Sequence, residues 1–204
     1  MRKTHGSEAK DRGKVLIPIA RAAISNVLGR PNGVTNEDFP WLHEQGASFV
    51  TLTQNQNLRG CIGTLDAHRP LLIDVKANAR AAAFHDPRFS PLTVHELDSV
   101  EIEVSLLSAM QPLVFLDEQD ALAQLQPGVD GVVFEFGHYR STFLPQVWNQ
   151  LPEIDLFMAH LKHKAGLQSN FWNEEVKIYR YSVTKWKEKD ITNEVEVLDK
   201  EAKS

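Results

Sequence analysis

The sequence predicts an α+β fold in which helices pack against mixed or antiparallel sheet. Two stretches, 46–64 and 131–144, each contain a pair of strand-like segments separated by a short turn, which is typical of β-hairpins. Apolar residues at helical spacing lie between these hairpins, but single strands and helices do not alternate steadily along the chain. A doubly wound parallel sheet requires that alternation, so hairpins combined with separate helices favour the α+β class.

The composition is that of a soluble globular protein that builds its own core. The chain has 204 residues, of which 42% are hydrophobic and 24% charged, and a chain of this length buries roughly 70% of its unfolded surface. Its single cysteine, Cys61, allows no internal disulfide, which suits a reducing compartment. We expect no secretory signal in the polar first residues, and no apolar run reaches the ~20 residues of a membrane span. We therefore expect a cytoplasmic protein without a membrane segment.

The charge distribution favours a small anionic ligand over nucleic acid. The net charge of −5 argues against general nucleic-acid binding, which requires clustered lysine and arginine. Residues 59–88, however, contain five basic and three acidic side chains, a net charge of +2, which leaves −7 for the remainder. A local basic patch on an acidic protein attracts small anions, although a solvated surface explains the same pattern.

The first predicted element is a helix. Residues 1–13 are polar and are expected to form a flexible tail. Apolar residues recur at helical spacing over 14–28, and Gly29 is a suitable C-cap. Pro18 favours a helix that begins near it, because proline is tolerated only in the first turn.

A β-hairpin follows a connecting segment. Residues 30–45 are expected to form a long surface connection, and the segment 46–53 is strand-like. The polar run 54–57 predicts a turn, and 58–64 predicts the returning strand.

A helix and a proline-rich loop come next. Pro70 suits the first turn of a helix that reaches Phe84, with small and apolar residues on its inner face. The loop 85–92 carries two prolines, and Thr93 with Glu96 forms the capping-box pattern of a short helix.

The second half of the chain continues with strands and helices in irregular order. The clearest strand is 100–108, whose residues alternate between apolar and polar over most of its length. The charged residues 186–204 are expected to form a C-terminal tail, which leaves 14–185 as the folded domain. The other predicted elements are helices at 117–126, 145–150 and 154–165, a hairpin over 131–144 and a last strand at 175–183.

The segment 58–63, LRGCIG, is the most distinctive part of the chain. It contains the only cysteine, with Arg59 and Gly60 before it and Gly63 after it. Glycines inside a strand usually mark a bulge or the close approach of another backbone or a ligand. A second segment, 84–91, adds histidine, aspartate and arginine in a loop with two prolines. The sequence therefore predicts a site formed by these two segments.

Six motifs occur in a characteristic order. They are LRGCIG at 58–63, DPRF at 86–89, VSLL at 104–107, PGVDG at 127–131, FLPQVW at 143–148 and KAGL at 164–167. Together they resemble the AMMECR family, in its prokaryotic type, the AmmeMemoRadiSam system protein A. The resemblance covers residues 15–185, and the motif around Cys61 is the hallmark of the family.

The resemblance implies an α+β fold with a larger and a smaller lobe. It also implies association with a Memo-type protein and a radical SAM enzyme, which accompany relatives in bacteria and archaea, sometimes within one polypeptide. No settled activity comes with the family. We therefore expect an accessory protein whose lobes form a cleft at 58–63 and 84–91. The cleft is expected to bind a small anionic or nucleotide-like ligand, or a partner's reactive segment.

Cys61 has two interpretations. As a nucleophile it requires a stabilised thiolate, for which Arg59 and Arg88 could supply positive charge. His85 would then act as acid or base, with Glu103 or Asp86 orienting it. Glu103 could instead act as a base near Arg59. As a small hydrophobe, Cys61 simply packs in its strand. The first interpretation predicts an enzyme, and the second leaves a binding protein or a pure protein-interaction module.

Arg59 and Arg88 are the strongest candidates for ligand binding. The planar guanidinium contacts a carboxylate or phosphate through two hydrogen bonds, and the neighbouring glycines let backbone N–H groups contribute. The alternative is that each arginine forms an ordinary ion pair with Asp86 or Glu103 and links two segments of the fold.

No cofactor or metal is expected. The sequence lacks the cysteine triplet of an iron–sulfur cluster, a phosphate loop and a dinucleotide fingerprint. Cys61, His85 and Asp86 do not have the tight spacing of metal ligands. Cofactor chemistry is therefore expected to reside in a partner protein.

Overall fold

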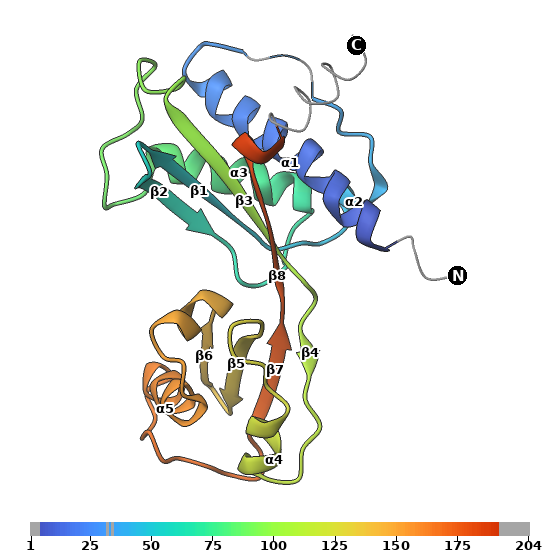
Figure 1. Cartoon of the computed structure of the whole chain (residues 1–204), viewed down its shortest axis with the longest axis vertical. Helices are drawn as coiled ribbons and strands as arrows, with labels where there is room; N and C mark the ends of the chain where they lie inside the picture. Colours follow the sequence, from blue (N-terminus) through green and yellow to red (C-terminus); the bar gives the residue numbers. More distant parts are fainter. Residues whose placement is uncertain (1–4, 32, 34, 192–204) are drawn as a thin grey trace, which may run out of the picture. The chain divides into compact units, whose positions relative to one another are not determined.

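Helices and two four-stranded sheets make up the part of the chain that the structure describes, which confirms the predicted α+β class (Figure 1). The computed structural model describes residues 5–31, 33 and 35–191. The chain divides into two compact units: unit 1 comprises Met1–Leu106 and Thr184–Ser204, and unit 2 comprises Leu107–Val183. The smaller unit is therefore inserted, in sequence, between two strands of the larger one.

The sheet of unit 1 contains the predicted first hairpin and has the strand order β2-β1-β3-β8. The central strand β1 pairs antiparallel with β2 on one side and β3 on the other. Asn55 and Gln56 form the hairpin turn with positive φ angles of 50° and 66°, as a two-residue turn between twisted strands requires. The strands are β1 (Ser48–Gln54), β2 (Asn57–Gly63), β3 (Val100–Leu107) and β8 (Val183–Lys187).

The long helices of unit 1, α1 (His5–Val27) and α3 (Leu71–Phe84), lie on the same side of this sheet (Figure 1). A short helix, α2 (Pro40–His43), interrupts the connection between α1 and β1. Alternate sheet residues, Val50, Leu52, Ile102 and Val104, are fully buried in the core with these helices. The residues between them, which lie on the opposite face of the sheet, are mostly polar and include Thr51, Glu101 and Glu103.

Helix α1 corrects two expectations. It begins at His5 rather than near residue 14, so it extends into the predicted tail, and Met1–Thr4 lie outside the described residues. Pro18 lies inside the helix and is exposed. The buried neighbours Leu16, Ile17 and Ile19 hold the helix in place on both sides of the proline. Tertiary packing therefore overrides the local penalty of the missing N–H group.

Unit 2 has its own sheet, with the strand order β4-β7-β5-β6, and its own core. The rings of Trp148 and Phe157 stack in this core with centroids 3.6 Å apart, and Trp148 Nε1 donates to the carbonyl oxygen of Asp130 at 2.7 Å. Its strands are β4 (Gln111–Pro112), β5 (Gly131–Phe136), β6 (Tyr139–Phe143) and β7 (Lys177–Tyr181). Its helices are α4 (Glu118–Ala123), the 3-10 helix η1 (Pro145–Asn149) and α5 (Ile154–Lys164).

The C-terminal prediction also needs correction. Two strands, β7 and β8, replace the single predicted strand at 175–183, so the first residues of the expected charged tail belong to the fold. Trp186 of β8 packs on the core of unit 1 and lies so close to Gly13 that a Cβ there would be 2.4 Å from the indole ring. Residues 192–204 of the expected tail lie outside the described residues.

Two smaller differences concern short elements. Residues 94–99 form turns instead of the short helix that Thr93 and Glu96 predicted. The Glu96 carboxylate accepts hydrogen bonds from both Thr93 N and Thr93 Oγ1, of which the first is one of the two bonds of a capping box. Strand β4 was not predicted, because two residues are too few for a periodic pattern. Over the part of the chain that the structure describes, no helix combines the length and apolar character needed to span a bilayer.

Candidate functional site

A β-bulge sets the geometry of the LRGCIG segment. Leu52 of β1 pairs with Gly60, whereas the next residue, Thr53, pairs with Leu58, so Arg59 is the extra residue of β2. A bulge of this kind leaves one residue unpaired and changes the direction of its side chain. The Arg59 side chain consequently reaches Glu96 in the segment that follows α3.

The two glycines of the motif have packing partners within the protein. A Cβ on Gly60 would lie 2.1 Å from the carbonyl oxygen of Ala82, so β2 and α3 approach too closely for any side chain. A Cβ on Gly63 would lie 2.1 Å from the ring of Phe49, its cross-strand neighbour. Close backbone approach therefore occurs at Gly60, to a helix. The predicted ligand contacts of both glycines remain predictions.

Asp86 and Arg88 hold the main chain of Cys61 at the edge of the sheet. The carboxylate of Asp86 accepts a hydrogen bond from Cys61 N at 2.8 Å, and Arg88 Nη2 donates to the Cys61 carbonyl oxygen at 3.2 Å. Arg88 also donates to both carboxylate oxygens of Asp86, at 2.9 and 2.7 Å. These two side chains thus occupy the place of a neighbouring strand along the outer edge of β2. We refer to them as the Asp86–Arg88 clamp.

The clamp perturbs the ionisation of both of its members. Hydrogen bonds from the Arg88 side chain, followed by those from the N–H groups of Cys61 and Arg88, lower the pKa of Asp86 far below its ordinary value despite its burial. The same ion pair raises the pKa of Arg88. Asp86 is 4% exposed, whereas Arg88 is half exposed. The carboxylate of the ion pair is therefore buried, and its guanidinium group lies at the protein surface.

Arg59 is held by Glu96 and leaves one nitrogen unused. Its Nε and Nη2 donate to the Glu96 carboxylate at 2.9 and 3.3 Å, while the side chain remains only 13% exposed. The Arg59 hydrogen bond is the main cause that lowers the pKa of Glu96 to about 2. Among the described residues, Arg59 Nη1 is the buried side-chain nitrogen without a hydrogen-bond partner.

Phe89 lies next to both arginines. The guanidinium carbon of Arg59 is 5.9 Å from the centre of the Phe89 ring, and that of Arg88 is 5.5 Å away. Cations at this distance are attracted by the face of an aromatic ring. Arg59, Arg88 and Phe89 therefore form one cluster, which we call the arginine cluster, beside the edge of β2.

The Cys61 thiol lies on the sheet face opposite the helices. Its sulfur is 3.2 Å from Thr51 Oγ1, and Thr51 is the cross-strand neighbour of Cys61 on one side and of Glu103 on the other. Glu103 in turn lies 3.7 and 3.9 Å from the ammonium groups of Lys185 and Lys187 on β8. The structure thus brings Cys61 and Glu103 into one polar row with Thr51 between them.

His85 lies at the C-terminal end of α3. Its backbone N–H donates to the Ala81 carbonyl oxygen at 2.8 Å, and its side chain is exposed. No contact between the His85 ring and Cys61 occurs among the interactions of the described residues. The acid–base role of His85 therefore stays a prediction, because no contact between its ring and the Cys61 thiol supports that role.

The sequence interpretation missed Glu96 and Thr51 as partners of the site. The proposed ion-pair partner for Arg59 was Asp86 or Glu103, but the observed one is Glu96. The capping-box pattern of Thr93 and Glu96 was visible in the sequence, and its carboxylate is the one that binds the arginine. No sequence pattern pointed to Thr51, because it lies beside Cys61 only through the pairing register of β1 and β2.

A buried polar network lies close to the site in the same unit. Asp74 is fully buried and accepts hydrogen bonds from Ser48, Thr64 and Arg69, at distances between 2.6 and 2.8 Å. Asn78 donates to the same carboxylate at 2.9 Å. These contacts join the start of β1 and the residue after β2 to helix α3, so the network stabilises the strand that carries Cys61.

Metal binding has no clear candidate in the described part of the chain. No three or more histidine, cysteine, aspartate or glutamate side chains come together there in a group able to hold a metal ion. The hydrogen bond between Cys61 and Asp86 is made by the backbone nitrogen of Cys61, which is no metal ligand.

Comparisons with known proteins agree on one family. The profile of the AMMECR1 family matches residues 17–186. Protein MJ0810 of Methanocaldococcus jannaschii is 34% identical over 194 residues, which cover 91% of this chain and 94% of that protein. A protein of Methanothermobacter thermautotrophicus is 37% identical over 177 residues, 85% of this chain and 92% of its own.

A solved structure is similar over most of both chains. The uncharacterized protein PH0010 from Pyrococcus horikoshii superposes with a TM-score of 0.70 at 31% sequence identity, covering 86% of this chain and 91% of that one. The similarity therefore extends across both units of the fold.

Proposed function

Because the chain belongs to the AMMECR1 family, we propose that it is an accessory protein that binds a small anionic or nucleotide-like ligand, or an anionic partner segment, at the arginine cluster. The observation that carries the proposal is the unpaired Nη1 of Arg59, held in a fixed direction by Glu96. An unsatisfied buried donor costs about 1–3 kcal/mol, and a ligand that displaces the groups covering Nη1 would recover this cost by placing an oxygen there. Phe89 adds an aromatic face on which a planar ligand can stack.

The charges of the site define how such a ligand binds. Arg59 and Arg88 are each paired with a carboxylate, so the four charged side chains sum to zero. Affinity then depends on directed hydrogen bonds more than on net charge. We expect ligand binding to depend only weakly on salt concentration, in contrast to binding by a basic patch.

Calorimetric titration against a panel of anionic metabolites and nucleotides tests the proposal. The Arg59→Lys/Arg88→Lys double variant keeps both charges but loses the planar fork, and we expect it to bind at least about tenfold more weakly, because bidentate contacts are lost. The Arg80→Lys/Arg140→Lys variant makes the same change at two arginines outside the cluster and serves as the control. Equal affinity of wild type and the first variant for every ligand of the panel would contradict the anion site.

The accessory part of the proposal follows the resemblance to the AmmeMemoRadiSam type. The expected partners are a Memo-type protein and a radical SAM enzyme, with the cofactor chemistry located in the partner. Co-purification of the tagged full-length chain from native cells tests this. Failure to recover either partner at any salt concentration would favour a protein that acts alone.

A second candidate function is an enzyme that uses Cys61 as a nucleophile. The contact of its sulfur with Thr51 and the nearby Arg88 favour this candidate. A thiolate at Cys61 requires such hydrogen-bond donors and positive charge. Measuring the alkylation rate of this single thiol against pH tests it: a rate that rises only above the ordinary thiol range near pH 8.5 would exclude an activated nucleophile.

A further inference from the structure

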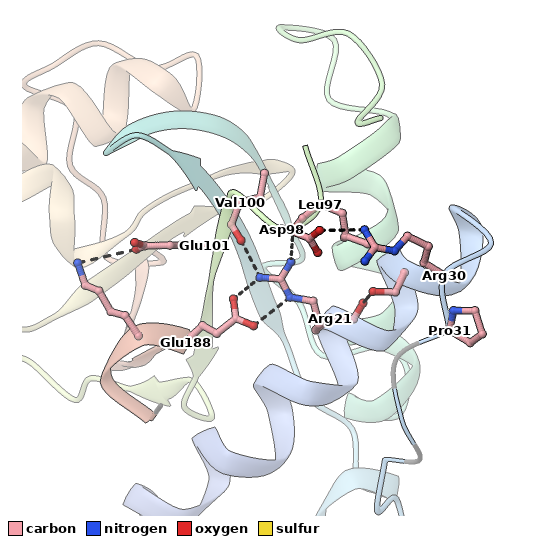
Figure 2. Close-up of a pocket in the computed structure, with 10 residues that line it drawn as sticks. Arg21, Arg30, Pro31, Leu97, Asp98, Val100, Glu101 and Glu188 are labelled. Carbon is pink, nitrogen blue, oxygen red and sulfur yellow. Dashed lines mark hydrogen bonds and ion pairs between the residues drawn. The ribbon is translucent and has the colours of Figure 1, made fainter. Parts of the chain in front are cut away.

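A cavity of about 660 Å³ in unit 1 is lined by charged side chains that pair with one another. Figure 2 shows Arg21 in its middle, where it donates to the Glu188 carboxylate and to two backbone carbonyl oxygens. The other charged residues of the lining form two exposed ion pairs, Arg30–Asp98 and Lys189–Glu101. Because each of these charged side chains has a partner within the protein, this cavity does not indicate a ligand.

A smaller cavity, of about 240 Å³, lies in unit 2. Its volume is below the roughly 300–1,000 Å³ of sites for drug-sized ligands, so it accommodates one small ring or a short chain. The lining comes from the segment 108–111, the turn between α4 and β5, and residues 180–182 at the end of β7. Its polar members are Ser108, Gln111, Gln126, Asp130, Arg180 and Ser182.

Asp130, in the PGVDG motif, brings a nearly buried carboxylate to this cavity. The residue is 7% exposed, and its Oδ2 accepts a hydrogen bond from Gln126 N at 2.8 Å. Within the part of the chain that the structure describes, no group donates a hydrogen bond to Oδ1. Buried carboxylates are normally matched by hydrogen bonds or by a cation. Because Asp130 lines the cavity, its second oxygen indicates a ligand that donates a hydrogen bond there.

Arg180 supplies a donor of opposite charge in the same cavity. Its Nη1 donates to the carbonyl oxygen of Gln124 at 3.1 Å, which holds the guanidinium group in place. Over the described residues, Arg180 forms no ion pair with Asp130 or with any other carboxylate. Its Nε and Nη2 are therefore able to donate to a ligand. The cavity thus contains one group that only accepts and one that only donates, and their charges cancel.

From this arrangement we infer that the cavity of unit 2 binds a neutral polyhydroxylated molecule of the size of a single sugar ring. A hydroxyl group both donates and accepts hydrogen bonds, so a polyol donates to Asp130 and accepts from Arg180 at the same time. A simple anion or cation would be attracted by one of these side chains and repelled by the other.

The uncharged part of the lining favours a polyol over a zwitterion such as an amino acid. Its hydroxyl and amide groups each donate and accept hydrogen bonds, and they belong to Ser108, Ser182, Gln111 and Gln126. A zwitterion would match the two charged groups but would have few atoms left for these four. Tyr181 also lines the cavity, but its hydroxyl already bonds to Thr142 and to the carbonyl oxygen of Phe143. It therefore offers ring surface to the C–H groups of a ligand.

Calorimetric titration of the full-length protein tests the inference. The probes are glycerol, myo-inositol, D-ribose, D-glucose, D-galactose and D-mannose. Glycine and L-serine, which are zwitterions, and glucose 6-phosphate, which is an anion, are titrated in parallel. We expect at least one neutral polyol to bind, with an affinity that does not change with salt concentration. Its deoxy derivatives that lack a bonded hydroxyl are expected to bind about tenfold more weakly.

Variants of the lining locate the binding site. Asp130→Asn and Arg180→Gln each remove a charged hydrogen-bonding group, and we expect each to weaken binding about tenfold or more. Gln111→Ala shortens an exposed side chain of the lining and is expected to weaken binding severalfold. Lys177→Gln changes an exposed charge on the strand of Arg180, outside the cavity, and is expected to bind like wild type. If Asp130→Asn does not fold, Arg180→Gln and Gln111→Ala decide the outcome.

The outcomes also separate this cavity from the arginine cluster. Polyol binding that weakens in the cavity variants but survives Arg59→Lys/Arg88→Lys supports the inference. Absence of binding by every polyol at millimolar concentration would overturn it. Binding of glycine or serine in place of the polyols would overturn it as well, and so would polyol binding that the cavity variants leave unchanged.

Discussion

At the scale of single residues, Gly60 shows how the hallmark motif depends on the size of a side chain. Its backbone is in an ordinary strand conformation, but a Cβ would lie 2.1 Å from the Ala82 carbonyl oxygen. The neighbour is helix backbone, which cannot rotate away as a side chain could. Glycine at this position is therefore explained by packing of β2 against α3 alone.

We predict that Gly60→Ala destabilises the protein by about 1–3 kcal/mol, the usual range for overpacking. The measurement is the urea midpoint of unfolding followed by circular dichroism. Leu58→Ala, at a 43% exposed position of the same strand, is the control and is expected to cost less. An unchanged midpoint for Gly60→Ala would show that the strand and helix can separate without loss.

Asp86 offers a second test at this scale. Asp86→Ala leaves the N–H of Cys61 and the guanidinium of Arg88 without their shared acceptor, and we expect a loss of about 1–3 kcal/mol. Asp98→Ala also removes a carboxylate that pairs with an arginine, but at an exposed site, so its loss should stay below about 1 kcal/mol. Equal losses for the two variants would mean that the clamp does not hold β2.

Side-chain partners were the part of the site least accessible from sequence. The sequence predicted one candidate site with Arg59, Cys61, Asp86 and Arg88. Hydrogen bonds join the last three of these residues, and Phe89 lies beside both arginines. The sequence could not identify the partner of Arg59, because the bulge in β2 depends on pairing with β1. The unpaired Nη1 of Arg59 follows from that bulge and could not be predicted either.

At the scale of elements, the outer edge of β2 is covered at Cys61 by the Asp86–Arg88 clamp. An edge strand with free N–H and carbonyl groups invites pairing with another chain. At Cys61 the Asp86–Arg88 clamp occupies both groups with side chains. Addition of a partner strand at this point is consequently blocked, and a partner segment has to bind through side chains instead.

The segment from Asp86 to Glu96 predicts how stability changes in acid. Both carboxylates have a lowered pKa in the folded protein, that of Glu96 falling to about 2. The unfolded chain therefore binds protons first as the pH falls, and the stabilisation present above about pH 5 is lost progressively towards pH 2.

Urea unfolding measured between pH 6 and pH 2 checks this expectation. Glu96→Gln keeps a hydrogen-bonding side chain but does not titrate, so we expect its stability to fall less steeply with pH than that of wild type. Glu101→Gln removes an exposed carboxylate of the same unit and serves as the control. If the stability of Glu96→Gln fell with pH as steeply as that of wild type, other groups would be responsible for the acid sensitivity.

Elements with strong local patterns were predicted well, and those held by distant contacts were not. The hairpin β1–β2 and helices α3 and α5 lie close to their predicted limits, because alternation, helical spacing and turn residues agree there. The early part of α1 and strand β8 were missed. Trp186 of β8 packs against Gly13 of α1, a contact between the two ends of the chain that no local pattern reveals.

At the scale of the whole molecule, the two units differ in how the chain forms them. Unit 2 is one continuous segment, Leu107–Val183, with its own sheet and its own apolar core. Unit 1 consists of two separate segments, because β8 completes a sheet whose other strands lie before residue 108. The larger unit can complete its sheet only after the smaller one has been synthesised.

This arrangement predicts that unit 2 folds alone and that unit 1 does not fold without β8. A chain of residues 107–183 retains the stacked Trp148 and Phe157 and all four strands of its sheet. We expect it to unfold cooperatively in urea, with the tryptophan fluorescence of a buried ring. A chain that ends at residue 182 loses β8 and the Arg21–Glu188 contact.

We expect that truncated chain to retain only the unfolding transition of unit 2, because the core of unit 1 loses the packing of Trp186. The full chain provides the reference for both transitions. An isolated 107–183 segment without cooperative unfolding would show that unit 2 depends on unit 1. A stable unit 1 in the chain ending at residue 182 would show that β8 covers its sheet without being needed to form it.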